Sequence, residues 1–121
     1  MIGRSLITLA FAGFAAAAAL AQGAWLAGVE DLPLMPGLIE RTEKSLVFDK
    51  PGGRIVEAEA FGRLERGAVE TFYAQTLPAL GWVAQGAGVY RRDEEVLRLE
   101  FGRESGALSV RFTINPGAQR P

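Results

Sequence analysis

The sequence feature that most constrains the fold is one stretch of helical periodicity set between stretches that alternate like β-strands. From residue 66 to residue 80 the apolar side chains trace one face of an α-helix. They are Val69, Phe72, Tyr73, Leu77 and Leu80. Pro78 lacks a backbone N–H, so we expect the regular helix to end near Thr76 or Leu77 and one further turn to reach Leu80. Gly81 suits the left-handed residue that closes a helix.

The stretches on either side of this helix have a period of two, which is typical of half-buried strands in an antiparallel sheet. In residues 55–63 small apolar side chains alternate with glutamates, and in residues 107–115 larger apolar side chains alternate with polar ones. Turn-forming residues separate the strands at 50–53, 86–88, 93–95 and 105–106. The residues expected to point inward are Val56, Ala58, Ala60, Leu97, Leu99, Phe101, Leu108, Val110, Phe112 and Ile114.

These elements predict an α+β domain over residues 46–115, with a flexible tail at 116–121. We expect an antiparallel sheet of about five strands with one amphipathic helix packed on one face, in the order β-β-α-β-β-β. The apolar sheet face and the amphipathic helix each need a cover, and each can cover the other. The residues expected at the centre are Trp82, Phe72, Tyr73, Phe101 and Phe112.

The first thirty residues differ from the rest and predict export. Arg4 and the α-amino group give a positive end, residues 5–20 carry no charge, and Ala19-Leu20-Ala21 has the small residues that signal peptidase reads. A signal peptide over 1–21 is the first interpretation. The rival interpretation is a retained membrane anchor over 5–29, long enough to span a bilayer about 30 Å thick; a third is a buried core helix. The first two both predict a periplasmic location, with the domain either free or held at the inner membrane.

Residues 22–45 predict a linker that contains two prolines, Pro33 and Pro36. Proline fixes its own φ and favours extended backbone in the residue before it. The linker is nevertheless too apolar for a purely solvated spacer, so we expect part of it to dock on the domain or on a partner. Its apolar residues are Leu32, Leu34, Met35, Leu38 and Ile39.

Composition removes most kinds of catalytic chemistry. The chain has no His and no Cys, and therefore lacks the usual general base, the thiol nucleophile and the commonest metal ligands. A net charge of −1 argues against a nucleic-acid surface. The carboxylate pair Glu57 and Glu59 and the acidic turn at residues 93–95 fit solvated surfaces better than a glycosidase or calcium site. We therefore expect no enzymatic activity, no cofactor and no metal.

The remaining candidate is a surface for a partner. Four arginines predict a basic stripe on the open sheet face, suited to carboxylates or anionic headgroups, and two linker residues add apolar contacts. The candidate residues are Arg91, Arg92, Arg98, Arg111, Leu34 and Met35. We expect an interaction or accessory module of the cell envelope. Its partner is expected to be another envelope or membrane protein, and its N-terminal segment is expected to associate with the membrane.

The alternative function is a periplasmic domain that binds a small molecule or lipid. An apolar pocket lined by Trp82, Tyr73 and Phe101 would favour it, and a filled core would argue against it.

The predicted helix and its turn carry the motif V-x-x-F-Y…L-P-x-L-G-W, which here runs from Val69 to Tyr73 and from Leu77 to Trp82. The motif resembles one found in small exported proteins and lipoproteins of bacteria. The resemblance extends over residues 46–114 and also includes Tyr90-Arg91-Arg92-Asp93 and Leu97-x-Leu99. It implies a sheet-plus-helix envelope domain with no established activity and brings no catalytic residues. The absence of Cys is a departure from the lipoprotein members.

Overall fold

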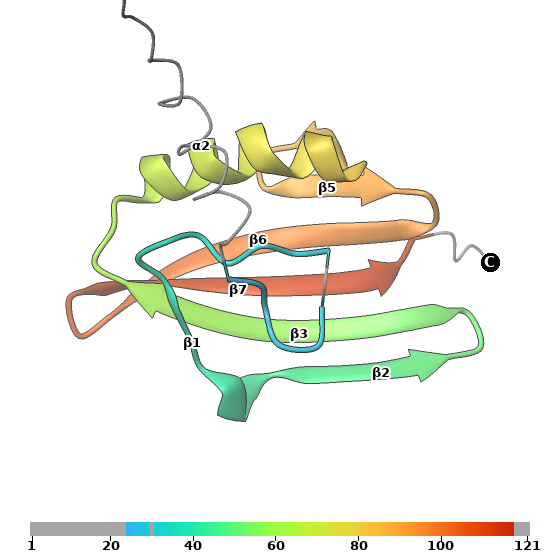
Figure 1. Ribbon diagram of the computed structural model, residues 1–121, viewed down its shortest axis with the longest axis horizontal. Coiled ribbons are helices and arrows are strands. Elements are labelled where there is room, and N and C mark those ends of the chain that lie inside the picture. The colour runs from blue at the N-terminus through green and yellow to red at the C-terminus, as the bar shows by residue number, and fades with distance from the viewer. Residues whose placement is uncertain (1–23, 30, 118–121) are drawn as a thin grey trace, which may run out of the picture.

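The structure, a computed structural model, describes residues 24–29 and 31–117, which form one antiparallel sheet with a helix on one face (Figure 1). The strands are β1 (Ile39–Glu40), β2 (Leu46–Lys50), β3 (Gly53–Gly62), β4 (Val83–Gly86), β5 (Val89–Arg92), β6 (Glu95–Glu104) and β7 (Ala107–Pro116). The helix is α2 (Arg66–Thr76), and two short 3₁₀ turns are η1 (Thr42–Lys44) and η2 (Leu77–Leu80). The predicted α+β class is confirmed. The predicted signal or anchor helix falls mainly on residues 1–23, outside the described residues.

The strands lie in the order β1-β3-β7-β6-β5-β4, and β2 pairs with β3 on the same edge as β1. The sheet has seven strands, where the sequence predicted about five. One reason is that residues 83–86 and 89–92, on either side of the turn expected at 86–88, form two strands, so that four strands and not three follow the helix. The other is that Ile39 and Glu40, within the predicted linker, pair with Phe61 and Ala60 of β3.

The inward-facing pattern predicted for the long strands is confirmed. On β3 the buried residues are Val56, Ala58 and Ala60, and they lie in register with Ile114, Phe112 and Val110 of β7. Small residues on one strand thus lie beside larger ones on the next, which fills the space above the sheet.

The helix ends as predicted. Regular α-helix stops at Thr76, η2 continues through Leu80, and Gly81 has a φ of 96°. The Trp82 N–H donates to the Leu77 carbonyl at 3.1 Å, which turns the chain back toward the sheet. Trp82 enters the core directly after this turn. Of the five predicted central residues, Trp82, Tyr73 and Phe112 are buried, whereas Phe72 and Phe101 pack at the margin.

The described part of the predicted linker packs on the domain. Residues 24–29 and 31–38, called here the N-terminal segment, lie in front of β7 and β3 in Figure 1, whereas α2 lies beside β5. The segment forms a loop closed by two backbone hydrogen bonds, from Leu26 N to Leu32 O at 3.0 Å and from Leu34 N to Ala24 O at 2.9 Å. Its buried side chains are Leu26, Val29, Leu32, Pro33 and Leu38. The segment and α2 together cover the inner face of the sheet.

Tyr73 fastens the N-terminal segment to the helix. Its side chain is fully buried; its hydroxyl donates to the Pro33 carbonyl at 2.7 Å and accepts from the Met35 N–H at 3.1 Å. Burial raises the pKa of this hydroxyl, so it stays protonated and keeps both bonds. The Tyr73 ring also packs edge-on against Phe112, with ring centroids 5.5 Å apart.

In the described part of the chain, no helix has the length and apolar character needed to cross a membrane. The membrane anchor considered as the rival interpretation covers residues 5–29 and so includes residues 24–29. Residues 24–29 are instead irregular, and their Leu26 and Val29 side chains are buried in the domain.

Candidate functional site

The edge of the sheet formed by β2 carries an exposed apolar run. Within the described residues, β2 pairs only with β3, so its other side has backbone groups open for pairing. Leu46, Val47 and Phe48 are 47%, 42% and 43% exposed. Proteins usually protect a free edge with charge, proline or irregularity, because an unprotected edge recruits further strands. Here such residues only flank the run: Lys44 lies before it, and Asp49, Lys50 and Pro51 follow it.

The apolar side chains of β2 reach both faces of the sheet. Val47 lies in register with the buried Val56 and therefore points toward the face that α2 covers. Leu46 and Phe48 point to the opposite, open face, where Phe48 lies in register with Ile55. We call residues 46–48 with their free backbone side the β2 edge.

The opposite edge of the sheet, β4, is built differently. It has four residues, and its register with β5 shifts between Ala84 and Gly86. A bulge of this kind bends a strand and interrupts its pairing. Val83 is 61% exposed, but it is the only large apolar residue on β4. The two edges are therefore not equivalent.

Three of the four predicted arginines share the open face of the sheet. Arg98 and Arg111 are exposed there, and Arg91 is half-buried beside Val96. Arg111 lies in register with Glu59 on one side and Glu100 on the other. Acidic neighbours thus interrupt the basic stripe and make the surface mixed in charge.

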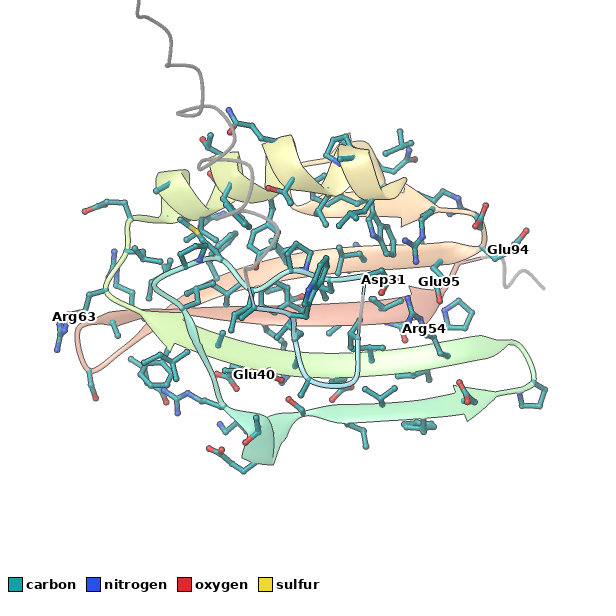
Figure 2. The ribbon with its side chains drawn as sticks, viewed as in Figure 1. Asp31, Glu40, Arg54, Arg63, Glu94 and Glu95 are labelled. Carbon is teal, nitrogen blue, oxygen red and sulfur yellow. The ribbon has the colours of Figure 1, made fainter. Side chains whose placement is uncertain are left out.

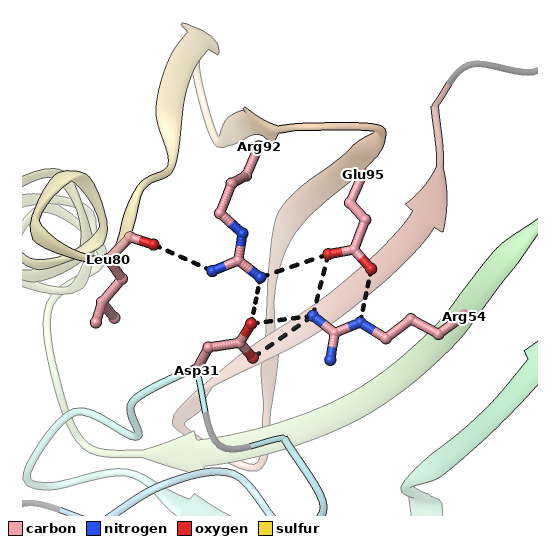
Figure 3. A network of polar contacts seen from close by, with 5 residues as sticks. All are labelled: Asp31, Arg54, Leu80, Arg92 and Glu95. Carbon is pink, nitrogen blue, oxygen red and sulfur yellow. Dashed lines mark hydrogen bonds and ion pairs between the residues drawn. The ribbon is translucent and has the colours of Figure 1, made fainter.

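Arg92 lies on the other face and belongs to a polar network with Asp31, Arg54 and Glu95 (Figure 3). Arg54 donates from Nε to Glu95 Oε2 at 2.7 Å and from Nη2 to Asp31 Oδ2 at 3.1 Å. Arg92 donates to the same Asp31 oxygen and to the Leu80 carbonyl, the latter at 3.1 Å. Figure 2 shows Asp31, Arg54 and Glu95 gathered at one end of the sheet.

The network ties separate parts of the chain together, and its charges are balanced. Its two guanidinium groups and two carboxylates join the N-terminal segment to β3, β5 and β6. Arg92 also stacks over the buried Trp82, with its guanidinium carbon 4.3 Å from the ring centroid. The sequence indicates Arg92 and the acidic turn at residues 93–95, but it does not indicate that they meet Asp31 and Arg54, because partners this far apart in the chain carry no local signal.

The pKa values of the network reflect its ion pairs. Burial alone would raise the pKa of Asp31, but the hydrogen bond from Arg92 and the charges of Arg54 and Arg92 outweigh it and lower that pKa. The hydrogen bond to Glu95 raises the pKa of Arg54, against the effect of burial.

Asp31 is therefore expected to make the free energy of unfolding depend on pH in the acidic range. Because its folded-state pKa lies below the ordinary value of 3.8, its contribution is complete above that value and is lost as the pH falls through the folded-state pKa. Asp31→Asn should cost on the order of 1 kcal/mol at pH 7 and weaken the loss of stability between about pH 5 and pH 2. Urea unfolding across this range measures both effects. Asp93→Asn, at an exposed turn, is the matched control; an equal response of both variants would contradict the assignment.

An uncharged groove of about 300 Å³ lies between the N-terminal segment and the helical side of the domain. One wall comes from Trp25, Leu34 and Pro36, and the other from residues of α2 and η2, including Phe72 and Ala79. None of the residues that line it carries a charge. Leu34, a predicted surface residue, thus lines this groove, whereas Met35 packs against the core and binds Tyr73 through its N–H.

The pocket expected between Trp82, Tyr73 and Phe101 is present only in part, because Trp82 lines none of the hollow beside α2. Trp82 and Tyr73, expected to line a ligand pocket, are buried in the core. A second hollow of about 310 Å³ lies beside α2 and includes Tyr73, Tyr90 and Phe101, with Glu70 also lining it. Burial and the negative charge of Glu70 raise the pKa of Tyr90.

Within the described residues, no cluster of three acidic side chains is placed to hold a metal ion. Comparisons of the chain with protein-family models, with curated proteins and with solved structures gave no match.

Proposed function

We propose that this protein is a non-enzymatic interaction module of the cell envelope, and that it binds another polypeptide by accepting an added strand at the β2 edge. The observation that carries the proposal is the exposed apolar run Leu46-Val47-Phe48 on an open strand. The chain has neither His nor Cys, which is consistent with a binding role.

Strand addition would use the two kinds of group that the β2 edge presents. The open backbone side of β2 supplies hydrogen bonds that are independent of sequence, and side chains on alternate faces supply selectivity. Since Leu46 and Phe48 lie on one face and Val47 on the other, the partner strand should carry apolar residues on both of its faces. The predicted export of the chain makes another envelope or membrane protein the expected partner.

Phe48→Lys should weaken capture of the partner about tenfold or more, since a charge on this edge opposes pairing with an apolar strand. Val83→Lys, on β4, is the matched control and should leave capture unchanged. The measurement is recovery of a stoichiometric partner from solubilised membranes with the tagged full chain, quantified for each variant. Hydrogen exchange of the recovered complex should show new protection of backbone amides in β2.

Two results would contradict this proposal. One is equal recovery of the partner by Phe48→Lys and by the unmodified chain. The other is a stoichiometric complex in which the β2 amides exchange as they do in the free protein.

A separate observation favours the alternative function, in which the protein binds a small molecule or lipid. The uncharged groove beside α2 is open, apolar and formed by two different parts of the chain. A ligand that fits it would be apolar, because no charged side chain lines the groove to pair with a charged group.

A further inference from the structure

We infer that the uncharged groove is the face that this protein lays against the membrane, where it receives acyl chains of bilayer lipids. This inference rests on the alternative function, for which it names the ligand, and does not depend on strand addition at the β2 edge. Four observations support it: the chemistry of the lining, the exposed Trp25 in its wall, the place where the chain joins the groove, and the position of the β2 edge.

The lining of the groove differs from that of the other hollows. Its only polar members are the uncharged Gln75 and Thr76, and apolar side chains form the rest. Three other hollows in the described part of the chain each include at least one charged side chain. A hydrocarbon chain can therefore occupy this groove without removing water from a charge, which would be costly.

Trp25 stands in the wall of the groove with 46% of its surface exposed. The indole ring combines a large apolar body with one polar N–H, and tryptophan is enriched where a membrane meets water. Trp25 would therefore lie at the boundary between headgroups and hydrocarbon while the groove receives the chains.

The groove adjoins the end of the uncharged run of residues 5–20, which the rival interpretation retains as part of a membrane anchor over 5–29. Ala24 lines the groove, and only three residues separate it from Leu20, the last residue of the uncharged apolar run. An extended chain advances at most about 3.6 Å per residue, so a connection of three residues can extend only a short way between an anchor and the groove. When the run is held in a bilayer, this short connection keeps the groove at the membrane surface.

This orientation leaves the other candidate surface accessible. Figure 1 shows β2 on the side of the molecule opposite α2. With the groove toward the lipid, the β2 edge points away from the membrane, where a partner strand can reach it.

The test uses the full chain in vesicles whose lipids carry bromine atoms on their acyl chains. Bromine quenches tryptophan fluorescence on contact. We expect quenching that disappears in Trp25→Phe, because Trp82 is buried in the core. Ala79→Glu places a carboxylate in the groove and should lower the quenching toward the level seen with unbrominated lipid. Ala68→Glu, on an exposed part of α2 outside the groove, is the matched control and should retain it.

Three outcomes would contradict binding of acyl chains in the groove, and each points to a different alternative. Quenching that Ala79→Glu leaves unchanged would overturn the inference, since Trp25 would then meet lipid without the groove. Absence of Trp25 quenching in chain that sediments with the brominated vesicles would overturn it in favour of a protein occupant, either this chain or a second copy. Binding of free fatty acid without quenching by brominated vesicles would replace the membrane with a soluble ligand. Phe48→Lys should not alter quenching, so failure here is distinct from failure at the β2 edge.

Discussion

Trp82→Ala is expected to destabilise the protein by about 3–5 kcal/mol, the cost of truncating a fully buried aromatic residue. Trp82 is 1% exposed and is among the largest side chains of the core. Its ring also supports Arg92, whose guanidinium carbon lies 4.3 Å from the ring centroid and which binds Asp31 and Leu80. Because a domain of this size has a stability on the order of 5 kcal/mol, the variant should be close to unfolding at room temperature.

The control for this prediction is Trp25→Ala, which removes the same side chain from a position that is 46% exposed. Its cost should be about 1 kcal/mol or less. Urea unfolding followed by far-UV circular dichroism measures both variants without relying on tryptophan fluorescence. Equal losses for the two variants would show that Trp82 is not the centre of the core.

Leu32→Ala is expected to cost about 2–5 kcal/mol, although the residue lies in a segment whose sequence predicts a linker. Leu32 has no exposed surface and packs in the core with Leu26 and Val29. The same substitution at Leu46, which is 47% exposed on β2, should cost about 1 kcal/mol or less. Urea unfolding of the two variants compares one chemical change in two environments.

The result for Leu32 decides whether the N-terminal segment belongs to the folded unit. If Leu32→Ala costs no more than Leu46→Ala, the segment does not contribute to the core. Such a result would also remove one wall of the uncharged groove, since Trp25, Leu34 and Pro36 lie in the same segment.

The two candidate surfaces illustrate what a local pattern can predict about function. Leu46, Val47 and Phe48 are visible in the sequence as a short apolar strand, but their exposure depends on which strand lies next to them. The predicted basic stripe is only partly present in the structure. Alternation places Arg91, Arg98 and Arg111 on one face, whereas Arg92 points the other way and binds Asp31.

The sequence by itself determined the local elements of this protein. Helical spacing from Val69 onward, the missing N–H of Pro78 and the left-handed Gly81 define a helix and its end within a few neighbouring residues. Period-two alternation likewise assigns each side of β3 and β7, because successive side chains of a strand point to opposite faces. These features need no knowledge of distant parts of the chain.

Only the tertiary structure decided how these elements assemble. Pairing of β3 with β7 joins residues that are far apart in the chain, and among the described residues no second strand pairs with β2. The N-terminal segment has no periodicity, and its two prolines predict an extended spacer; it is held in place by the Tyr73 hydroxyl and by the ion pairs of Asp31. Contacts of this kind depend on which surfaces remain uncovered once the sheet has formed, and no local pattern in the sequence encodes that.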